Sequence, residues 1–186
     1  MRFRPDDVLL VVDIQRDFCS GGSLAIAGAD EIIPTIDRLI GEATAAGATI
    51  VAGRDWHPAN HVSFEARGGP WPPHCVAGTK GAELHPNLRL PLGTPLVSKG
   101  TDRDKDPYSA FEGRGLIEQL RRQGTRRIVI CGLALDFCVR ASALDAARAG
   151  FETHVLLAAT RPVTKAAGEA AVTEMVKAGV ILDADT

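Results

Sequence analysis

The hydrophobic positions of this chain gather into six short aliphatic runs, separated by longer stretches in which apolar and polar residues mix. Each run has the length of a strand, and its continuous rather than alternating hydrophobicity is typical of strands that are covered on both faces. The six expected strands are residues 8–13, 48–53, 94–98, 127–132, 153–158 and 180–182. This pattern predicts a buried, mostly parallel sheet.

Several of the stretches between these runs repeat their apolar residues at helical spacing. One face of residues 31–46 is apolar and consists of Ile32, Ile36, Leu39, Ile40 and Ala43. Further helices are expected at residues 116–123, 139–149 and 164–178. Strands that alternate with helices predict a single α/β domain over residues 1–186, with helices on both faces of a six-stranded sheet in a three-layer α/β/α arrangement.

Residues 54–92 break this alternation, because they are rich in glycine, proline and histidine and show little periodicity. A loop of this length inside a compact domain is usually functional. Most of the chain's histidines lie here, close to an aspartate. We therefore expect this loop to bind a metal ion and substrate.

The loop carries the side chains of a candidate metal site. Asp55 and His57 are two residues apart, so both can point the same way from an extended segment, and His61 and His74 follow. Zinc, manganese and iron accept imidazole and carboxylate ligands, and three protein ligands plus water leave a position open for chemistry. We predict Asp55, His57 and His74 as the core ligands. His61 is a fourth ligand or a neighbour of the site, and loop histidines that only form hydrogen bonds are the alternative.

Polar residues follow other strands of the expected sheet at the point where each strand ends. Asp13 ends the first strand, Lys99 follows the third, and Cys138 comes shortly after the fourth and begins a helix. In open α/β sheets, functional sites form beyond the carboxyl ends of the strands. Because Asp55 follows the second strand, all of these side chains are expected at one edge of the sheet.

Each of these three residues has a chemical role that its position allows. Cys138 is a candidate nucleophile, because a helix N-terminus favours the thiolate and its N–H groups can hold an oxyanion. Asp13 could take the thiol proton and return it to a leaving amine, and Lys99 could keep Asp13 ionised. A buried inert thiol, a turn-capping carboxylate and a solvated strand end are the structural alternatives.

Aromatic residues lie close in sequence to the same segments. Phe18, Trp71 and Tyr108 are candidates for a flat pocket wall, with ordinary packing as the alternative. His85 and His154 are interpreted as surface or core histidines.

Composition and charge exclude several classes of function. The formal net charge of -2 gives no basic surface for nucleic acid or for an anionic membrane. No apolar run approaches the roughly 20 residues that cross a bilayer, and the N-terminus shows no secretory signal. Neither a GxGxxG motif after the first strand nor a Walker A sequence is present. The 4 cysteines lack zinc-finger spacing, and we interpret them as free thiols of a cytoplasmic protein.

Five motifs occur in order along nearly the whole chain: VVDIQRDFCSGGSL around Asp13, DWH at Asp55, WPPHCVAGT at Trp71, KG at Lys99 and ALDFCV around Cys138. Together they resemble the nicotinamidases, which belong to the isochorismatase-like cysteine hydrolases. The Asp13 and Cys138 motifs mark this superfamily. The Asp-x-His and Trp-Pro-Pro-His motifs point to nicotinamidase within it.

The resemblance implies an isochorismatase-like hydrolase fold and a catalytic triad. In this triad Cys138 is the nucleophile, Asp13 the general base and acid, and Lys99 the charge partner. It also implies that the Leu133–Ala134 peptide bond is cis. The backbone N–H groups of Ala134 and Cys138 would hold the oxyanion.

The resemblance further implies a substrate and a cofactor. Nicotinamide would be hydrolysed to nicotinate and ammonia through a cysteine thioester, and pyrazinamide would also be accepted. One divalent metal ion, zinc with iron or manganese as alternatives, would hold the ring nitrogen of the substrate. Phe18, Trp71, Tyr108 and Leu133 would line the pocket. The highly charged stretch 101–106 departs from the family's pattern.

Other functions are compatible with the same residues. A metallohydrolase would attack with metal-bound hydroxide. An amidase of the same superfamily would act on a non-pyridine amide or carbamoyl compound, and a non-enzymatic binding protein could have kept the fold. No single surface patch stands out, so the sequence leaves open whether the chain forms a homo-oligomer.

Overall fold

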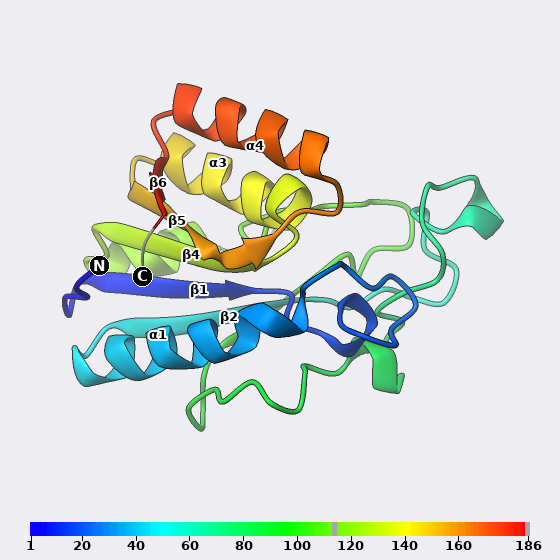
Figure 1. The fold of residues 1–186 in the computed structure, drawn as a ribbon, viewed down its shortest axis with the longest axis horizontal. Helices are drawn as coiled ribbons and strands as arrows, with labels where there is room; N and C mark the ends of the chain where they lie inside the picture. Colours follow the sequence, from blue (N-terminus) through cyan, green and yellow to red (C-terminus); the bar gives the residue numbers. More distant parts are fainter. Residues whose placement is uncertain (113–114, 185–186) are drawn as a thin grey trace.

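The computed structural model describes residues 1–112 and 115–184 and contains one six-stranded sheet (Figure 1). The strands are β1 (Asp7–Val12), β2 (Thr49–Asp55), β3 (Leu96–Lys99), β4 (Arg127–Leu133), β5 (Glu152–Arg161) and β6 (Ile181–Asp183). They lie in the order β3-β2-β1-β4-β5-β6, and every pairing is parallel. Residues 113–114 and 185–186 of the expected domain lie outside the described residues.

Helices cover both faces of the sheet (Figure 1). They are α1 (Ile33–Ala45), α2 (Leu116–Arg122), α3 (Arg140–Arg148) and α4 (Lys165–Lys177). Side chains alternate between the two faces of a strand. Leu9 and Val11 of β1 therefore pack in one core with α1, whereas Val8, Leu10 and Val12 pack in the other core with α2, α3 and α4. The predicted three-layer fold class is confirmed.

All of the expected strands and helices form, and their ends differ from the expected positions by at most three residues. The strand expected at residues 153–158 continues to Arg161 as β5, after a register shift against β4 between Ile130 and Gly132. The helix expected at residues 139–149 is preceded by a π-helical turn, η5 (Leu135–Val139), and α3 begins only at Arg140. No helix among the described residues combines the length and the hydropathy that a membrane span requires.

The strand order has its topological switch point at β1. The chain leaves β1 toward β2 on one side and returns to β4 on the other. In open parallel sheets, ligands bind outside the carboxyl ends of the strands where the order reverses in this way. The long loop between β2 and β3 covers this edge, with only the short 3-10 turns η3 (Glu65–Arg67) and η4 (Lys80–Ala82) within it.

Candidate active site and metal centre

Lys99, the last residue of β3, brings the candidate catalytic side chains together. Its Nζ lies 2.7 Å from Asp13 Oδ2 and 3.1 Å from Cys138 Sγ, and it also donates a hydrogen bond to Asp55 Oδ1. The side chains of Lys99 and Asp13 are 1% and 0% exposed. Burial opposes the charge of this ammonium group, but Asp13 and Asp55 raise the pKa of Lys99 well above its ordinary value. Lys99 is therefore a buried, permanent cation among acidic groups.

Asp13 follows β1 in the left-handed backbone region, with φ at 48°. This conformation is uncommon for a non-glycine residue and persists only where the surrounding structure enforces it. Lys99 reaches the Asp13 carboxylate as an ion pair, and the Cys138 thiol also favours its ionised form. Burial raises the pKa of Asp13 to about 6, and the charge of Lys99 limits that rise. This carboxylate can therefore accept a proton near neutral pH.

Cys138 lies in the π-helical turn η5, just before α3. Burial raises the pKa of its thiol well above the ordinary value, although the charge of Lys99 opposes this. The buried setting keeps the thiol protonated at rest, which fits the expectation that Asp13 takes its proton. Asp13, Asp55 and Cys138 each place one ligand atom within 4.8 Å of the others. The thiol proton therefore has a carboxylate acceptor close by.

The turn before Cys138 has the backbone features that the resemblance implies. The Leu133–Ala134 peptide bond is cis. Ala134 lines the same cavity as Cys138. Within the described part of the chain, the backbone N–H of Ala134 donates no hydrogen bond, so it is available to an oxygen in that cavity.

Asp55, His57 and His74 form a buried group whose ligand atoms all lie within 4.8 Å of one another. His57 Nδ1 lies 3.0 Å from the carbonyl oxygen of Gly100, and His74 Nδ1 lies 2.8 Å from that of Pro72. A carbonyl can only accept, so each ring carries its proton on Nδ1 and leaves Nε2 for a metal. Two imidazole nitrogens and a carboxylate fit a zinc-type ion with an open coordination position.

The charges around this group also suit a cation. Burial acts to raise the pKa of Asp55, but Lys99 and His57 outweigh it and hold that pKa below its usual range. Burial lowers the pKa of His74, which favours the neutral imidazole that metals bind. Asp55 raises the pKa of His57 against the effect of burial, so a proton competes with a metal ion at this ring.

His61 lies beside this group rather than within it. Its ring stacks on that of His57, with centroids 4.1 Å apart. Both of its nitrogens are engaged elsewhere, Nδ1 at 2.7 Å from Ser63 Oγ and Nε2 at 2.7 Å from the carbonyl oxygen of Lys105. The charged stretch 101–106 thus supports the metal loop through His61.

A cavity of about 70 Å³ opens next to Cys138. Its wall includes the expected residues Phe18, Trp71 and Tyr108, and Trp71 Nε1 donates a hydrogen bond of 3.2 Å to the Tyr108 hydroxyl. Leu133, which was also expected there, is fully buried in the core on the α1 side and does not line the cavity. Its neighbour Ala134 takes that place.

Several site residues were missed by sequence reasoning. Gln15 is fully buried and clamps Asp55 in both directions: its Nε2 donates to the Asp55 carbonyl oxygen and its Oε1 accepts from the Asp55 N–H, each at 2.8 Å. A polar residue three positions after the last residue of β1 was the available signal. Phe137 completes the aromatic wall, 5.1 Å from Trp71 and 5.4 Å from Tyr108 between ring centroids. Leu24, Ala25, Ile26 and Val163 also line the cavity, and no local pattern marks them.

Comparison with known families decides the ancestry of the chain. The model of the isochorismatase domain matches residues 7–186. The chain belongs to the isochorismatase domain family. Among its curated relatives within this family, a nicotinamidase of Acinetobacter baylyi is 41% identical over 177 residues, which cover 83% of this chain and 81% of that protein. A nicotinamidase/pyrazinamidase of Mycobacterium tuberculosis is 39% identical over 182 residues, 94% of this chain and 96% of that protein.

Solved structures of this family have the same architecture. The pyrazinamidase of Pyrococcus horikoshii in complex with zinc superimposes with a TM-score of 0.92 at 46% identity, covering 96% of this chain and 99% of that one. PnC1 from L. infantum in complex with nicotinate gives a TM-score of 0.91 at 39% identity, covering 98% and 95%. The predicted isochorismatase-like family and fold are confirmed.

Proposed function

We propose that this chain hydrolyses nicotinamide to nicotinate and ammonia through a thioester on Cys138. One observation carries the proposal: a single buried ammonium group, that of Lys99, contacts the thiol, the Asp13 carboxylate and a carboxylate of the metal-binding group. This contact supports the proposal, because it would hold a nucleophile, a base and a substrate-orienting centre in one site. The nicotinamidase and pyrazinamidase relatives agree with the sequence-based prediction of an amidohydrolase of this type.

The first half of the reaction forms the thioester. Asp13 takes the proton of Cys138 as the sulfur attacks the amide carbon, and Lys99 offsets the negative charge that develops. The backbone N–H groups of Ala134 and Cys138 stabilise the oxyanion. Asp13 then gives its proton to the amide nitrogen, the C–N bond breaks and ammonia leaves.

The second half releases the acid. With the amine gone, Asp13 is again ionised and accepts a proton from water, which attacks the thioester carbon. The C–S bond then breaks, Cys138 regains a proton from Asp13, and the carboxylic acid loses its own proton to solvent and departs as nicotinate. Splitting one difficult amide cleavage into two acyl transfers is the advantage of the covalent route.

Asp55, His57 and His74 would hold the divalent metal, which supplies a Lewis acid for the ring nitrogen of the substrate. We propose zinc, because the donor set fits it and the P. horikoshii structure contains it. The ring would lie against Phe18, Trp71 and Phe137, which offer flat apolar surface. Pyrazinamide carries a ring nitrogen in the same place and should be accepted as well.

Ammonia release from purified protein tests this function. Cys138→Ala should abolish the release, whereas Cys131→Ala, which removes a thiol buried within β4, should retain most of it. Turnover by Cys138→Ala that stops on chelation would instead indicate attack by metal-bound hydroxide. Activity on non-pyridine amides alone would indicate the other amidase.

We further propose a cytoplasmic enzyme that acts in NAD salvage as a single domain. The free cysteines Cys19, Cys75, Cys131 and Cys138 support a reducing compartment. Nicotinamide is the product that NAD-consuming reactions release, and its hydrolysis would return the ring to pyridine nucleotide synthesis. Fractionation of cells followed by immunoblotting tests the location.

A further inference from the structure

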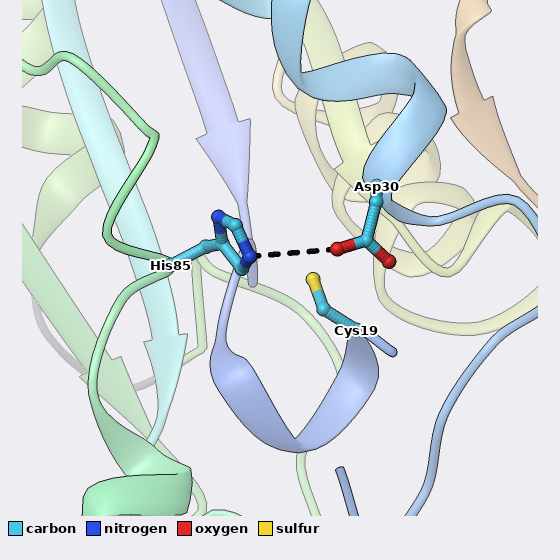
Figure 2. Close-up of side chains that lie close together, drawn as sticks. All are labelled: Cys19, Asp30 and His85. Atoms are coloured by element: carbon cyan, nitrogen blue, oxygen red, sulfur yellow. Dashed lines mark ion pairs between the residues drawn. The ribbon is translucent and has the colours of Figure 1, made fainter. Parts of the chain in front are cut away.

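Three metal-ligating side chains that the proposed reaction does not use converge at a second place. Cys19 follows the 3-10 turn η1 (Arg16–Phe18), Asp30 begins the turn η2 (Asp30–Ile32), and His85 lies in the loop after η4. We call these residues the Cys19 cluster. Their ligand atoms all lie within 4.8 Å of one another. Figure 2 shows the sulfur directed toward the gap between the imidazole ring and the carboxylate.

The spacing within the Cys19 cluster resembles that of the candidate metal centre. His85 Nε2 lies 3.5 Å from Asp30 Oδ1 (Figure 2), and His57 Nε2 lies 3.6 Å from Asp55 Oδ2. Both separations exceed the roughly 2.7–3.2 Å of an N–H···O hydrogen bond. They are close to the separation of about 3.4 Å between two ligands that each lie about 2.1 Å from a tetrahedral ion.

Surrounding hydrogen bonds hold the ligands in place. Asp30 Oδ2 accepts from the Ser20 N–H at 2.9 Å and from the Ser20 hydroxyl at 2.6 Å, which leaves Oδ1 toward the gap. The backbone N–H of His85 donates to the carbonyl oxygen of Ile14 at 2.8 Å. Such support of ligating groups is a regular feature of protein metal sites. A long contact of 3.3 Å from the Asn87 N–H to His85 Nδ1 would be lost on binding, because Nδ1 then carries the ring proton.

The Cys19 cluster also has an entry path. Cys19 is buried, but the side chain of Asp30 is 41% exposed and that of His85 is 14% exposed. Both line a surface groove together with Asp37 and Asn87. A cation can therefore enter with its hydration water and keep one water molecule as a further ligand.

We propose that Cys19, Asp30 and His85 form a second metal site, which takes a zinc-type cation with one sulfur, one nitrogen and one oxygen ligand. Thiolate and imidazole select zinc and other borderline cations over magnesium and calcium. On binding, the S–H proton of Cys19 passes to solvent and a metal–sulfur bond forms, with no change of oxidation state. Burial and the charge of Asp30 raise the pKa of the free Cys19 thiol to about 11, so binding strengthens as pH rises.

The site would stabilise the wall of the substrate cavity. Cys19 directly follows Phe18, which lines that cavity, and Ile26 lies between Cys19 and Asp30 and lines it too. A cation at the Cys19 cluster would tie these segments to the loop that carries His85. The second site is thus structural and does not depend on the proposed reaction.

Cobalt(II) titration of the full chain tests the proposal. Thiolate bound to cobalt gives a charge-transfer band in the near ultraviolet, and the centre formed by Asp55, His57 and His74 contains no sulfur ligand. At saturation, the intensity of this band should correspond to one thiolate-bound cobalt per chain, with up to two cobalt ions bound in all because the first centre also takes a zinc-type cation. It should disappear in Cys19→Ala and persist in Cys138→Ala, which controls for the thiol near the first centre. Zinc content after dialysis should fall by one equivalent in Cys19→Ala.

A second variant keeps the test decisive if Cys19→Ala does not fold. His85→Gln should weaken cobalt binding at the band-forming site by about tenfold or more. His154→Gln, at a histidine that pairs with Glu152 and Asp183, should leave it unchanged. The absence of the band in the wild-type chain, its persistence in Cys19→Ala, or an unchanged affinity in His85→Gln would overturn the proposal. The band is independent of ammonia release, so its loss and failure of the proposed function are separate results.

Discussion

Replacing Lys99 with methionine removes the charge on which the active-site arrangement depends. The ammonium lies 2.7 Å from Asp13 Oδ2, donates to Asp55 and lies 3.1 Å from Cys138 Sγ, with its side chain 1% exposed. Methionine keeps the apolar stem and most of the length. The variant therefore leaves the buried Asp13 carboxylate without the cation that neutralises it.

The size of the effect follows from the lost attraction between Lys99 and Asp13, because the repulsion between Asp13 and Asp55 already acts in the wild type. At an effective dielectric constant of about 20, opposite charges separated by the 2.7 Å between Lys99 Nζ and Asp13 Oδ2 attract by about 6 kcal/mol, equivalent to about 4.5 pKa units. The pKa of Asp13, about 6 in the wild type, should therefore rise by at least about two units. At pH 7 the base is then mostly protonated, and kcat/KM should fall by at least about tenfold from this cause alone.

Two measurements check this expectation. The pH profile of ammonia release between about pH 5 and 9 should shift its acid limb upward by about two units in Lys99→Met. Urea unfolding at pH 7 should show a loss of about 3–5 kcal/mol, since a buried ion pair loses one partner. Lys105→Met, at a lysine whose side chain is 75% exposed, is the matched control and should change neither. A Lys99→Met variant with the wild-type acid limb would refute the assigned pairing with Asp13.

Four further predictions concern the same site. In the wild type, kcat/KM should fall about tenfold per pH unit below about pH 6, because Asp13 must be ionised to accept the thiol proton; a flat profile contradicts this role. The pKa of Asp13 in the folded chain lies above its unfolded value of 3.8, so its contribution to stability is present below about pH 4 and is lost as pH rises through about 6. In urea unfolding, the fall in the free energy of unfolding over this pH range should therefore be about 3 kcal/mol smaller in Asp13→Asn than in the wild type. Gly100→Ala should lower metal affinity at least about tenfold in a dialysis assay, because the added Cβ would lie 2.2 Å from His57 Cε1. The control is Gly93→Ala, also at positive φ but with nothing within 4 Å of the added Cβ, which should bind metal normally. A strong chelator should raise KM for nicotinamide and zinc should restore it, whereas unchanged kinetics would remove the metal from substrate binding.

The layers of the fold could be predicted because each strand is a continuous aliphatic run. The ends were harder to predict. β5 continues through Thr160 and Arg161, whose polar side chains gave no strand signal, and no local pattern predicts the π-helical turn that carries Cys138. The end of each strand was informative, since parallel strands bring Asp13 and Lys99 to one edge.

Contacts between loops could not be predicted in this way. The sequence did not show that Lys99 would join the Asp55 carboxylate to the thiol, because that depends on the register of β2 against β3. Nor did it show that both nitrogens of His61 would be taken by Ser63 and Lys105. His85 was interpreted as a surface or core histidine, and its approach to Cys19 arises from loops that no periodicity relates.

Intact-mass spectrometry of acid-quenched protein tests the central claim most directly. Within the first turnover of nicotinamide, the wild-type chain should gain the mass of one nicotinoyl group, and peptide mapping should place it on Cys138. Lys99→Met should accumulate it more slowly. Turnover with no acylated protein at any quench time, or a nicotinoyl group on another residue, would contradict the covalent mechanism at this site.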